Sequence, residues 1–125
     1  MGLKINSTLQ AIDLMDNNIG NEGVITIAEA LKTNSTLQKI NLSRNQIRVE
    51  GGIAFAEALK TNSTLQEIDF TRNQIGDKRA TAIAKTLKTN FTLQTITLYN
   101  NQINFININI YLFQKCSNTQ ILRLS

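Results

Sequence analysis

The chain contains no histidine, proline or tryptophan, and its only cysteine is Cys116. Without histidine it lacks the commonest general base, and Cys116 has no imidazole to activate it as a nucleophile. A single cysteine cannot form an internal disulfide, and the N-terminal residues show no secretion signal, so a cytoplasmic location is expected. No apolar run approaches the roughly 18 residues of a membrane span, and no Gly-rich phosphate loop is present. We therefore expect neither an enzyme nor a membrane-spanning protein, and no cofactor.

What the chain does contain is an internal repeat. Residues 37–47 recur once upstream and twice downstream at a constant spacing of 28 residues, and the 125 residues suit a single domain. In each copy, apolar positions such as Ile40 and Leu42 alternate with polar ones, as in a short strand with one buried face. An asparagine follows each strand, and we expect these residues to form a buried ladder that satisfies backbone groups at the turn. The ladder residues are Asn17, Asn45, Asn73 and Asn101.

Between the strands the apolar spacing changes to that of a helix. Val24, Ile27, Ala28 and Leu31 follow the i, i+3, i+4, i+7 pattern, and the same pattern returns one and two repeats later. Amphipathic helices are therefore expected near residues 22–32, 49–60 and 77–88. The resulting domain map has a partial repeat at 1–8, regular repeats at about 9–36, 37–64 and 65–92, and an irregular terminal repeat at 93–125.

The terminal repeat leaves one assignment open. Residues 104–111 alternate like a strand, whereas the architecture requires a helix there, with Ile106, Ile110 and Phe113 at its buried positions. We prefer the helix, followed by a final edge strand at 121–124. The Asn-x-Ser/Thr sequences at Asn34, Asn62 and their equivalents share one phase of the repeat, so turns that close the helices explain them better than glycosylation does.

The frame L-x-x-L-x-L-x-x-N-x-L at a fixed period, followed by the segment Ala54-Phe55-Ala56-Glu57-Ala58-Leu59-Lys60, resembles the leucine-rich repeats of the ribonuclease-inhibitor-like class, and it is most similar to the arrays of NOD-like receptors. The resemblance spans about residues 3–103. It implies a right-handed, curved α/β solenoid with parallel strands on the concave side, helices on the convex side, and a protein-binding role. The chain departs from the pattern at Arg79, where the preceding repeats have glycine, and in a last repeat that is two residues short.

The positions that vary between repeats are those of the expected concave face, which we interpret as a non-enzymatic binding surface for a protein of unknown identity. Interfaces favour Tyr, Arg and Met, so Tyr99, Arg72, Arg44 and Met15 are the preferred contacts. A face that is merely solvated is the alternative. The candidate partner-binding residues are Asp13, Met15, Asp16, Asn41, Arg44, Asp69, Arg72, Thr97, Tyr99 and Asn100.

Charge adds two further expectations. Arg44 and Arg72 occupy the same phase of adjacent repeats, where like charges repel and an acidic partner would relieve the repulsion. A metal site is disfavoured, because Asp13 and Asp69 lie two repeats apart with Asn41 between them. Residues 1–77 carry a net charge of −2, whereas residues 78–125 carry +6 without any acid. A basic patch at Lys78, Arg79, Lys85 and Lys88 for nucleic acid or an anionic surface is the alternative function.

Two other possibilities come from the repeat class and from the chain end. Ribonuclease inhibitors and Ran GTPase-activating proteins have this class of repeat, so regulation of an enzyme is an alternative, although no functional residue of theirs matches a position here. The chain opens within a repeat and shows no polar cap, which indicates either a fragment of a longer array or an N-terminal end that self-associates.

Overall fold

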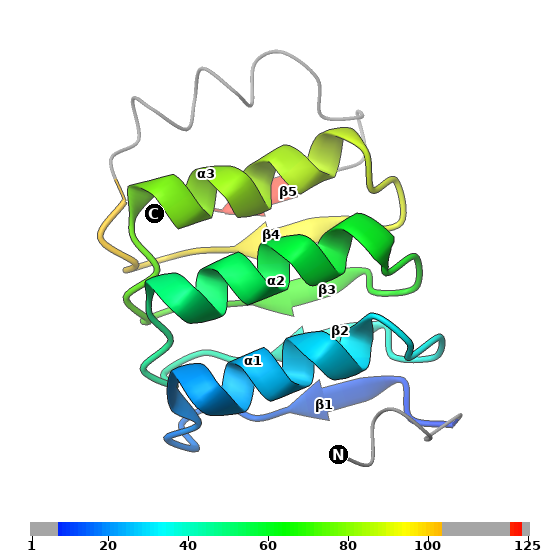
Figure 1. Ribbon diagram of the computed structural model, residues 1–125, viewed down its shortest axis with the longest axis horizontal. Helices are drawn as coiled ribbons and strands as arrows, with labels where there is room; N and C mark the ends of the chain where they lie inside the picture. The colour runs from blue at the N-terminus through cyan, green and yellow to red at the C-terminus, as the bar shows by residue number, and fades with distance from the viewer. Residues whose placement is uncertain (1–7, 104–120, 124–125) are drawn as a thin grey trace.

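The computed structural model describes residues 8–103 and 121–123, in which strands and helices alternate along the chain. The strands are β1 (Ala11–Asp13), β2 (Lys39–Asn41), β3 (Glu67–Asp69), β4 (Thr95–Thr97) and β5 (Ile121–Arg123). The helices are α1 (Gly20–Leu31), α2 (Val49–Thr61) and α3 (Asp77–Lys85), and a 3₁₀ turn at Thr86–Lys88 follows α3. The helices stack side by side in one layer in front of the strands (Figure 1).

The strands form one parallel sheet in chain order, from β1 to β5. The spacing of 28 residues places each residue beside its copy: Ile12 pairs with Ile40, Ile40 with Ile68, and Ile68 with Ile96. The predicted fold class, an α/β array of parallel strands alternating with helices, is confirmed. The predicted edge strand is present as β5, which pairs with β4. The helix or strand expected at 104–115, with Ile106, Ile110 and Phe113, lies outside the described residues.

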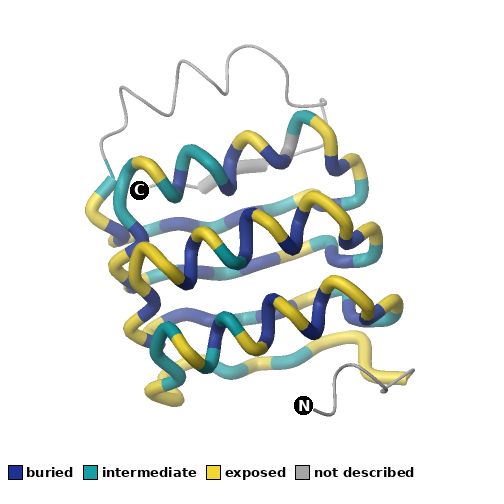
Figure 2. The backbone as a smooth tube through the Cα atoms, in the orientation of Figure 1, coloured by how far each residue is buried: buried dark blue, intermediate teal, exposed yellow. Residues whose placement is uncertain are grey.

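The core lies between the sheet and the helix layer, and buried residues recur along α1–α3 and along β2–β4 (Figure 2). The strands β2, β3 and β4 each contribute a buried isoleucine in their centre, and each helix contributes an apolar stripe such as Val24, Ile27 and Leu31. Phe55 of α2 and Phe70 after β3 replace smaller residues of other repeats, and their rings meet edge to face with centroids 5.1 Å apart. Such a pair adds about 0.5–1.5 kcal/mol beyond its buried area.

The helix ends differ in detail from the expectation. Instead of an α-helix through residue 88, α3 ends at Lys85, and the 3₁₀ turn completes the segment. No side chain at the position before α2 caps this helix; Asn21 of the preceding helix does so instead. Its Oδ1 accepts hydrogen bonds from the backbone N–H groups of Arg48 (2.8 Å) and Gly51 (3.3 Å). One helix thus satisfies the donors that the next leaves open at its start.

The asparagine ladder extends over three buried residues. Asn45, Asn73 and Asn101 are at most 4% exposed. The Asn73 Oδ1 accepts from the backbone N–H groups of Asn45 and Ile47, both at 3.0 Å, and its Nδ2 donates to the carbonyls of Leu42 and Phe70. The expectation of four buried residues is wrong for Asn17, which is exposed and donates only to the nearby Met15 carbonyl among the side-chain bonds found.

A second set of buried asparagines closes the helices at Asn34, Asn62 and Asn90. The Asn62 Oδ1 accepts from the backbone N–H of Leu65 (2.9 Å), while its Nδ2 donates to the Leu31 carbonyl one repeat back (2.8 Å). Asn90 repeats the arrangement one step further along the array. These amides are occupied inside the folded repeat, which agrees with turns rather than glycosylation sites.

Candidate functional site

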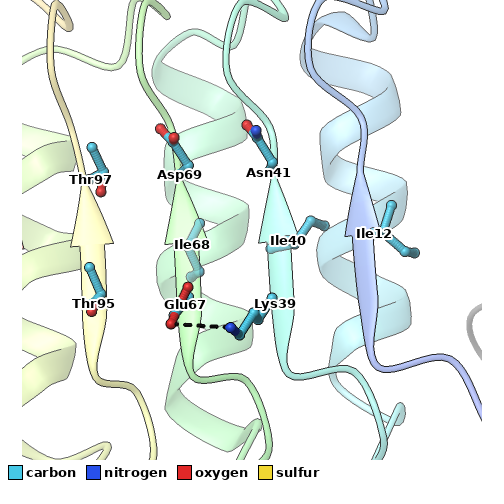
Figure 3. Close-up of a pocket in the computed structure, with 9 residues that line it drawn as sticks. All are labelled: Ile12, Lys39, Ile40, Asn41, Glu67, Ile68, Asp69, Thr95 and Thr97. Carbon is cyan, nitrogen blue, oxygen red and sulfur yellow. Dashed lines mark ion pairs between the residues drawn. The ribbon is translucent and has the colours of Figure 1, made fainter.

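The outward side chains of β1–β4 and of the turns after them form a single surface, which we call the strand face. Its centre is a shallow hollow of about 340 Å³ over the middle strands. In Figure 3, Lys39 and Glu67 point toward one another across neighbouring strands, and their Nζ and Oε1 atoms are 3.6 Å apart. Both side chains are about half exposed, so this pair contributes little to stability. The hollow is lined by Ile12, Lys39, Ile40, Asn41, Glu67, Ile68, Asp69, Thr95 and Thr97.

Three of the candidate contacts also hold the turns that leave the strands. The Asp69 Oδ1 accepts from the Thr71 backbone N–H (2.8 Å) and hydroxyl (2.6 Å). Asn41 makes the same two bonds one repeat earlier, and Asp13 accepts from the Met15 backbone N–H. The partly buried Asn41 and Asp69 are therefore oriented by the turns, and they present their remaining surface beside the hollow (Figure 3).

The next row along the strand face brings charged candidates together. Asp16, Arg44, Arg72 and Asn100 are exposed, and each has a left-handed backbone with φ between 55° and 60°. Backbone hydrogen bonds join these turns, because the N–H of Arg44 donates to the Thr71 carbonyl and the N–H of Arg72 to the Tyr99 carbonyl. The two arginines are thus immediate neighbours. Within residues 8–103, neither guanidinium has an ion-pair partner.

The other candidates border this row at different distances. Tyr99 is half-buried and lies in the turn next to that of Arg72, while Thr97 lies at the end of β4. Met15 is 48% exposed, but it follows β1, three strands from Tyr99. At about 4.8 Å per strand the two are separated by roughly 14 Å. The structure therefore gathers Arg44, Arg72 and Tyr99, and it leaves Met15 at the far end of the same face.

The alternative sites are not assembled in the same way. No group of three His, Cys, Asp or Glu side chains suitable for a metal occurs among the described residues. No helix there is long and apolar enough to cross a membrane. Of the proposed basic patch, Arg79 and Lys85 line a groove between α2 and α3, and Lys78 borders, together with Arg79, a hollow at the start of α3. Lys88 lies in the 3₁₀ turn after α3. That groove was not anticipated, although Arg79 stands out in the sequence as a departure from the repeat.

Comparison with known proteins agrees with this architecture. A family model described as "Leucine Rich repeat" matches residues 6–28, 33–56 and 61–84, more than half of the chain. No curated protein matches the sequence. Among solved structures, one described as Leiomodin-1 Actin-Binding Site 2 superposes with a TM-score of 0.89 at 23% identity, covering 99% of this chain and 75% of the other. The tropomodulin C-terminal domain of Caenorhabditis elegans gives a TM-score of 0.86 at 10% identity, covering 99% and 78%.

Proposed function

Since the chain belongs to the leucine-rich repeat family, we propose that it is a non-enzymatic module that binds a protein partner across the strand face. The observation that carries this proposal is the row containing Arg44 and Arg72, in which adjacent cations are exposed without an internal counter-charge. Placing two like charges side by side is unfavourable unless something else compensates them. Tyr99 beside them adds a side chain of the kind that anchors interfaces.

The partner that fits this row carries an acidic surface. A carboxylate can bind a guanidinium through two parallel hydrogen bonds, which gives both energy and orientation. Actin is the first candidate to test, because one of the structural neighbours is described as an actin-binding site. The proposal itself concerns the strand face and does not depend on that particular partner.

A binding titration with purified actin tests both statements. We expect Arg44→Ala combined with Arg72→Ala to weaken binding and to reduce its salt dependence, since exposed charges act mainly through screened attraction. Thermal stability should not fall, because alanine tolerates the left-handed backbone about as well as arginine does and the repulsion between the two cations is removed. The matched control is Arg48→Ala with Lys78→Ala, which removes the same charge from exposed positions outside the row.

The outcomes separate the proposals. If the control pair weakens binding as much as the Arg44 and Arg72 pair, the attraction is a general charge effect and the row is not the contact. If actin fails to bind, the same two pairs are compared in affinity capture from a cell extract. Equal recovery of every captured protein by both pairs would then remove the strand face from consideration.

Enzyme regulation remains within this proposal as a choice of partner: a nuclease or small GTPase recovered on the strand face would identify it. Within the family, we further propose that the repeats belong to the ribonuclease-inhibitor-like class and are similar to the arrays of NOD-like receptors. We also propose that residues 1–125 form one domain and that it acts in the cytoplasm. For nucleic acid, salt-dependent binding to a generic duplex is the test.

Self-association through the N-terminal end is a further proposal. It is supported by Ile12, Leu14 and Ile19, which are only half-buried where their copies in the next repeat are buried. Light scattering that reports a monomer at all accessible concentrations would overturn it.

A further inference from the structure

At the two helix–helix interfaces, a large side chain packs against a glycine, but the two residues change places: the glycine is on the second helix of the first interface and on the first helix of the second. Between α1 and α2, Val24 fits against Gly51, where an added Cβ would lie only 2.4 Å from the Val24 Cγ1. Between α2 and α3 the equivalent positions are Gly52 and Arg79. There the small residue is on the first helix, and a Cβ on Gly52 would lie 3.0 Å from the Arg79 Cβ. The stem of Arg79 therefore occupies the space that valine fills one repeat earlier.

This exchange places a guanidinium in a groove between α2 and α3 that has room for about 350 Å³, which we call the α2–α3 groove. The Arg79 side chain is partly buried, and its Nε is buried without a hydrogen-bond partner among the described residues. A buried donor without an acceptor is unfavourable. The groove is lined by Ile53, Ala56, Glu57, Lys60, Arg79, Ala82, Lys85, Thr86 and Thr89.

The same side of α2 carries an apolar strip. Val49 and Ile53 are each 40% exposed and lie four residues apart, so they are neighbours on one helix face. Val49 borders the hollow that also contains Arg79, and Ile53 lines the groove itself. At the position of Val49 the preceding repeat has Asn21, which caps the next helix. An apolar residue has replaced a polar one, and no helix within the described residues covers it.

We propose that the α2–α3 groove is a second protein-binding site, whose occupant is an acidic amphipathic helix of a partner. Apolar side chains of that helix pack on Val49 and Ile53, and a carboxylate reaches Arg79. When the guanidinium turns toward this carboxylate, the Nε–H group of Arg79 gains the hydrogen-bond acceptor that it otherwise lacks. The lining of the groove carries three cations, Lys60, Arg79 and Lys85, against one acid, Glu57, which is paired with Lys60 at 2.8 Å.

The groove favours a peptide over a nucleic acid for two reasons. Its floor is built of the side chains of Ile53, Ala56 and Ala82, and apolar floors of this kind accept apolar side chains rather than phosphates. Among the described residues, no aromatic side chain on which a base could stack lines the groove. The site is on the opposite layer from the strand face, so occupation of one leaves the other accessible (Figure 1).

The test uses the full chain and a synthetic helical peptide of about 15 residues, with leucines spaced three and four apart and glutamates beside them. We expect this peptide to bind at least about tenfold more tightly than a version with lysine in place of every glutamate. Arg79→Met keeps the unbranched stem over Gly52 and removes the charge, and it should weaken binding of the glutamate peptide about tenfold or more. Ile53→Ser should also weaken it.

Lys32→Met is the matched control, since it removes the same charge from an exposed position after α1 that lines neither the groove nor the hollow beside Val49. It should leave binding nearly unchanged, as should Arg44→Ala with Arg72→Ala, so that failure here is distinct from failure of the strand face. Equal loss in Arg79→Met and Lys32→Met would overturn the proposal. Absence of binding, or preference for a generic duplex or for phosphatidylserine vesicles over the glutamate peptide, would overturn it as well.

Discussion

Asn73→Ala tests the hydrogen bonds that join one repeat to the next. The side chain is buried and is shared between two turns: its oxygen serves the backbone N–H groups of Asn45 and Ile47, and its amide serves the carbonyls of Leu42 and Phe70. Alanine replaces none of these bonds. Asn45 and Ile47, whose N–H groups lose their acceptor, are themselves buried.

The magnitude follows from the two donors alone. A buried group left without its partner costs about 1–3 kcal/mol, so two N–H groups predict a loss of roughly 2–6 kcal/mol in the free energy of unfolding. The lost carbonyl contacts add to this. Small proteins are stable by only about 5–15 kcal/mol, so Asn73→Ala should remove a large part of the total.

Urea unfolding followed by circular dichroism measures the effect, with the midpoint falling and the slope unchanged if the folded state is preserved. The chain supplies its own control in Asn17→Ala. Asn17 holds the same place in its repeat but is exposed, so this variant should change stability by only about 0.5 kcal/mol, as exposed substitutions do. If the two variants lost similar stability, or if Asn73→Ala lost less than about 1 kcal/mol, the ladder would not be what joins the repeats.

Three further predictions concern other parts of the structure. Gly52→Val should destabilise the protein by about 1–3 kcal/mol through overpacking against Arg79. In an Arg79→Gly background, the same substitution should cost about 0.5–3 kcal/mol less in urea unfolding. If the two losses were additive, the side chains at positions 52 and 79 would not compete for the same space. Arg72→Gly should raise the melting temperature by removing the strain of a left-handed residue, a gain of up to about 1 kcal/mol, and a lower melting temperature would reveal a stabilising contact of the side chain. The hydrogen bond and charge of Lys60 lower the pKa of Glu57 below its ordinary value of 4.5, so the pair stabilises the fold above that pH and the contribution disappears as pH falls through the lowered pKa. Lys60→Met should therefore reduce stability slightly at neutral pH and leave it unchanged in acid. A loss of stability that persists in acid would assign the effect to packing.

Much of the fold can be predicted from the sequence because one period governs it. The spacing of 28 residues fixes the register of the strands, and the change from period 2 to the helical spacing locates the helices. Burial of Asn17 was predicted wrongly because a repeating pattern does not show which copy lacks a neighbour in the described array. The early end of α3 likewise depends on tertiary packing, and helix boundaries are poorly encoded in short windows.

The site could be predicted less completely. The strand face follows from the alternation along each strand, so its residues were identifiable, but the turn-holding bonds of Asn41 and Asp69 depend on the local conformation after the strand. The departure at Arg79 is visible in the sequence. Its compensation by Gly52 is not, because it requires knowledge of which residues of adjacent helices face one another. The i, i+4 spacing of Val49 and Ile53 is visible in the sequence, but the buried apolar stripe of the same helix is the stronger pattern.

The buried asparagines give the assembly a direction. Asn45, Asn73, Asn62 and Asn90 each extend side-chain bonds toward the repeat that precedes them in the chain. Asn45 and Asn73 accept from backbone N–H groups of that preceding repeat, whereas Asn62 and Asn90 donate to its carbonyls, so these particular bonds of a repeat form only when its successor is in place. During synthesis from the amino terminus, the turns after β1, β2 and β3 therefore lack the side-chain oxygen of the following ladder asparagine until the next unit has been made.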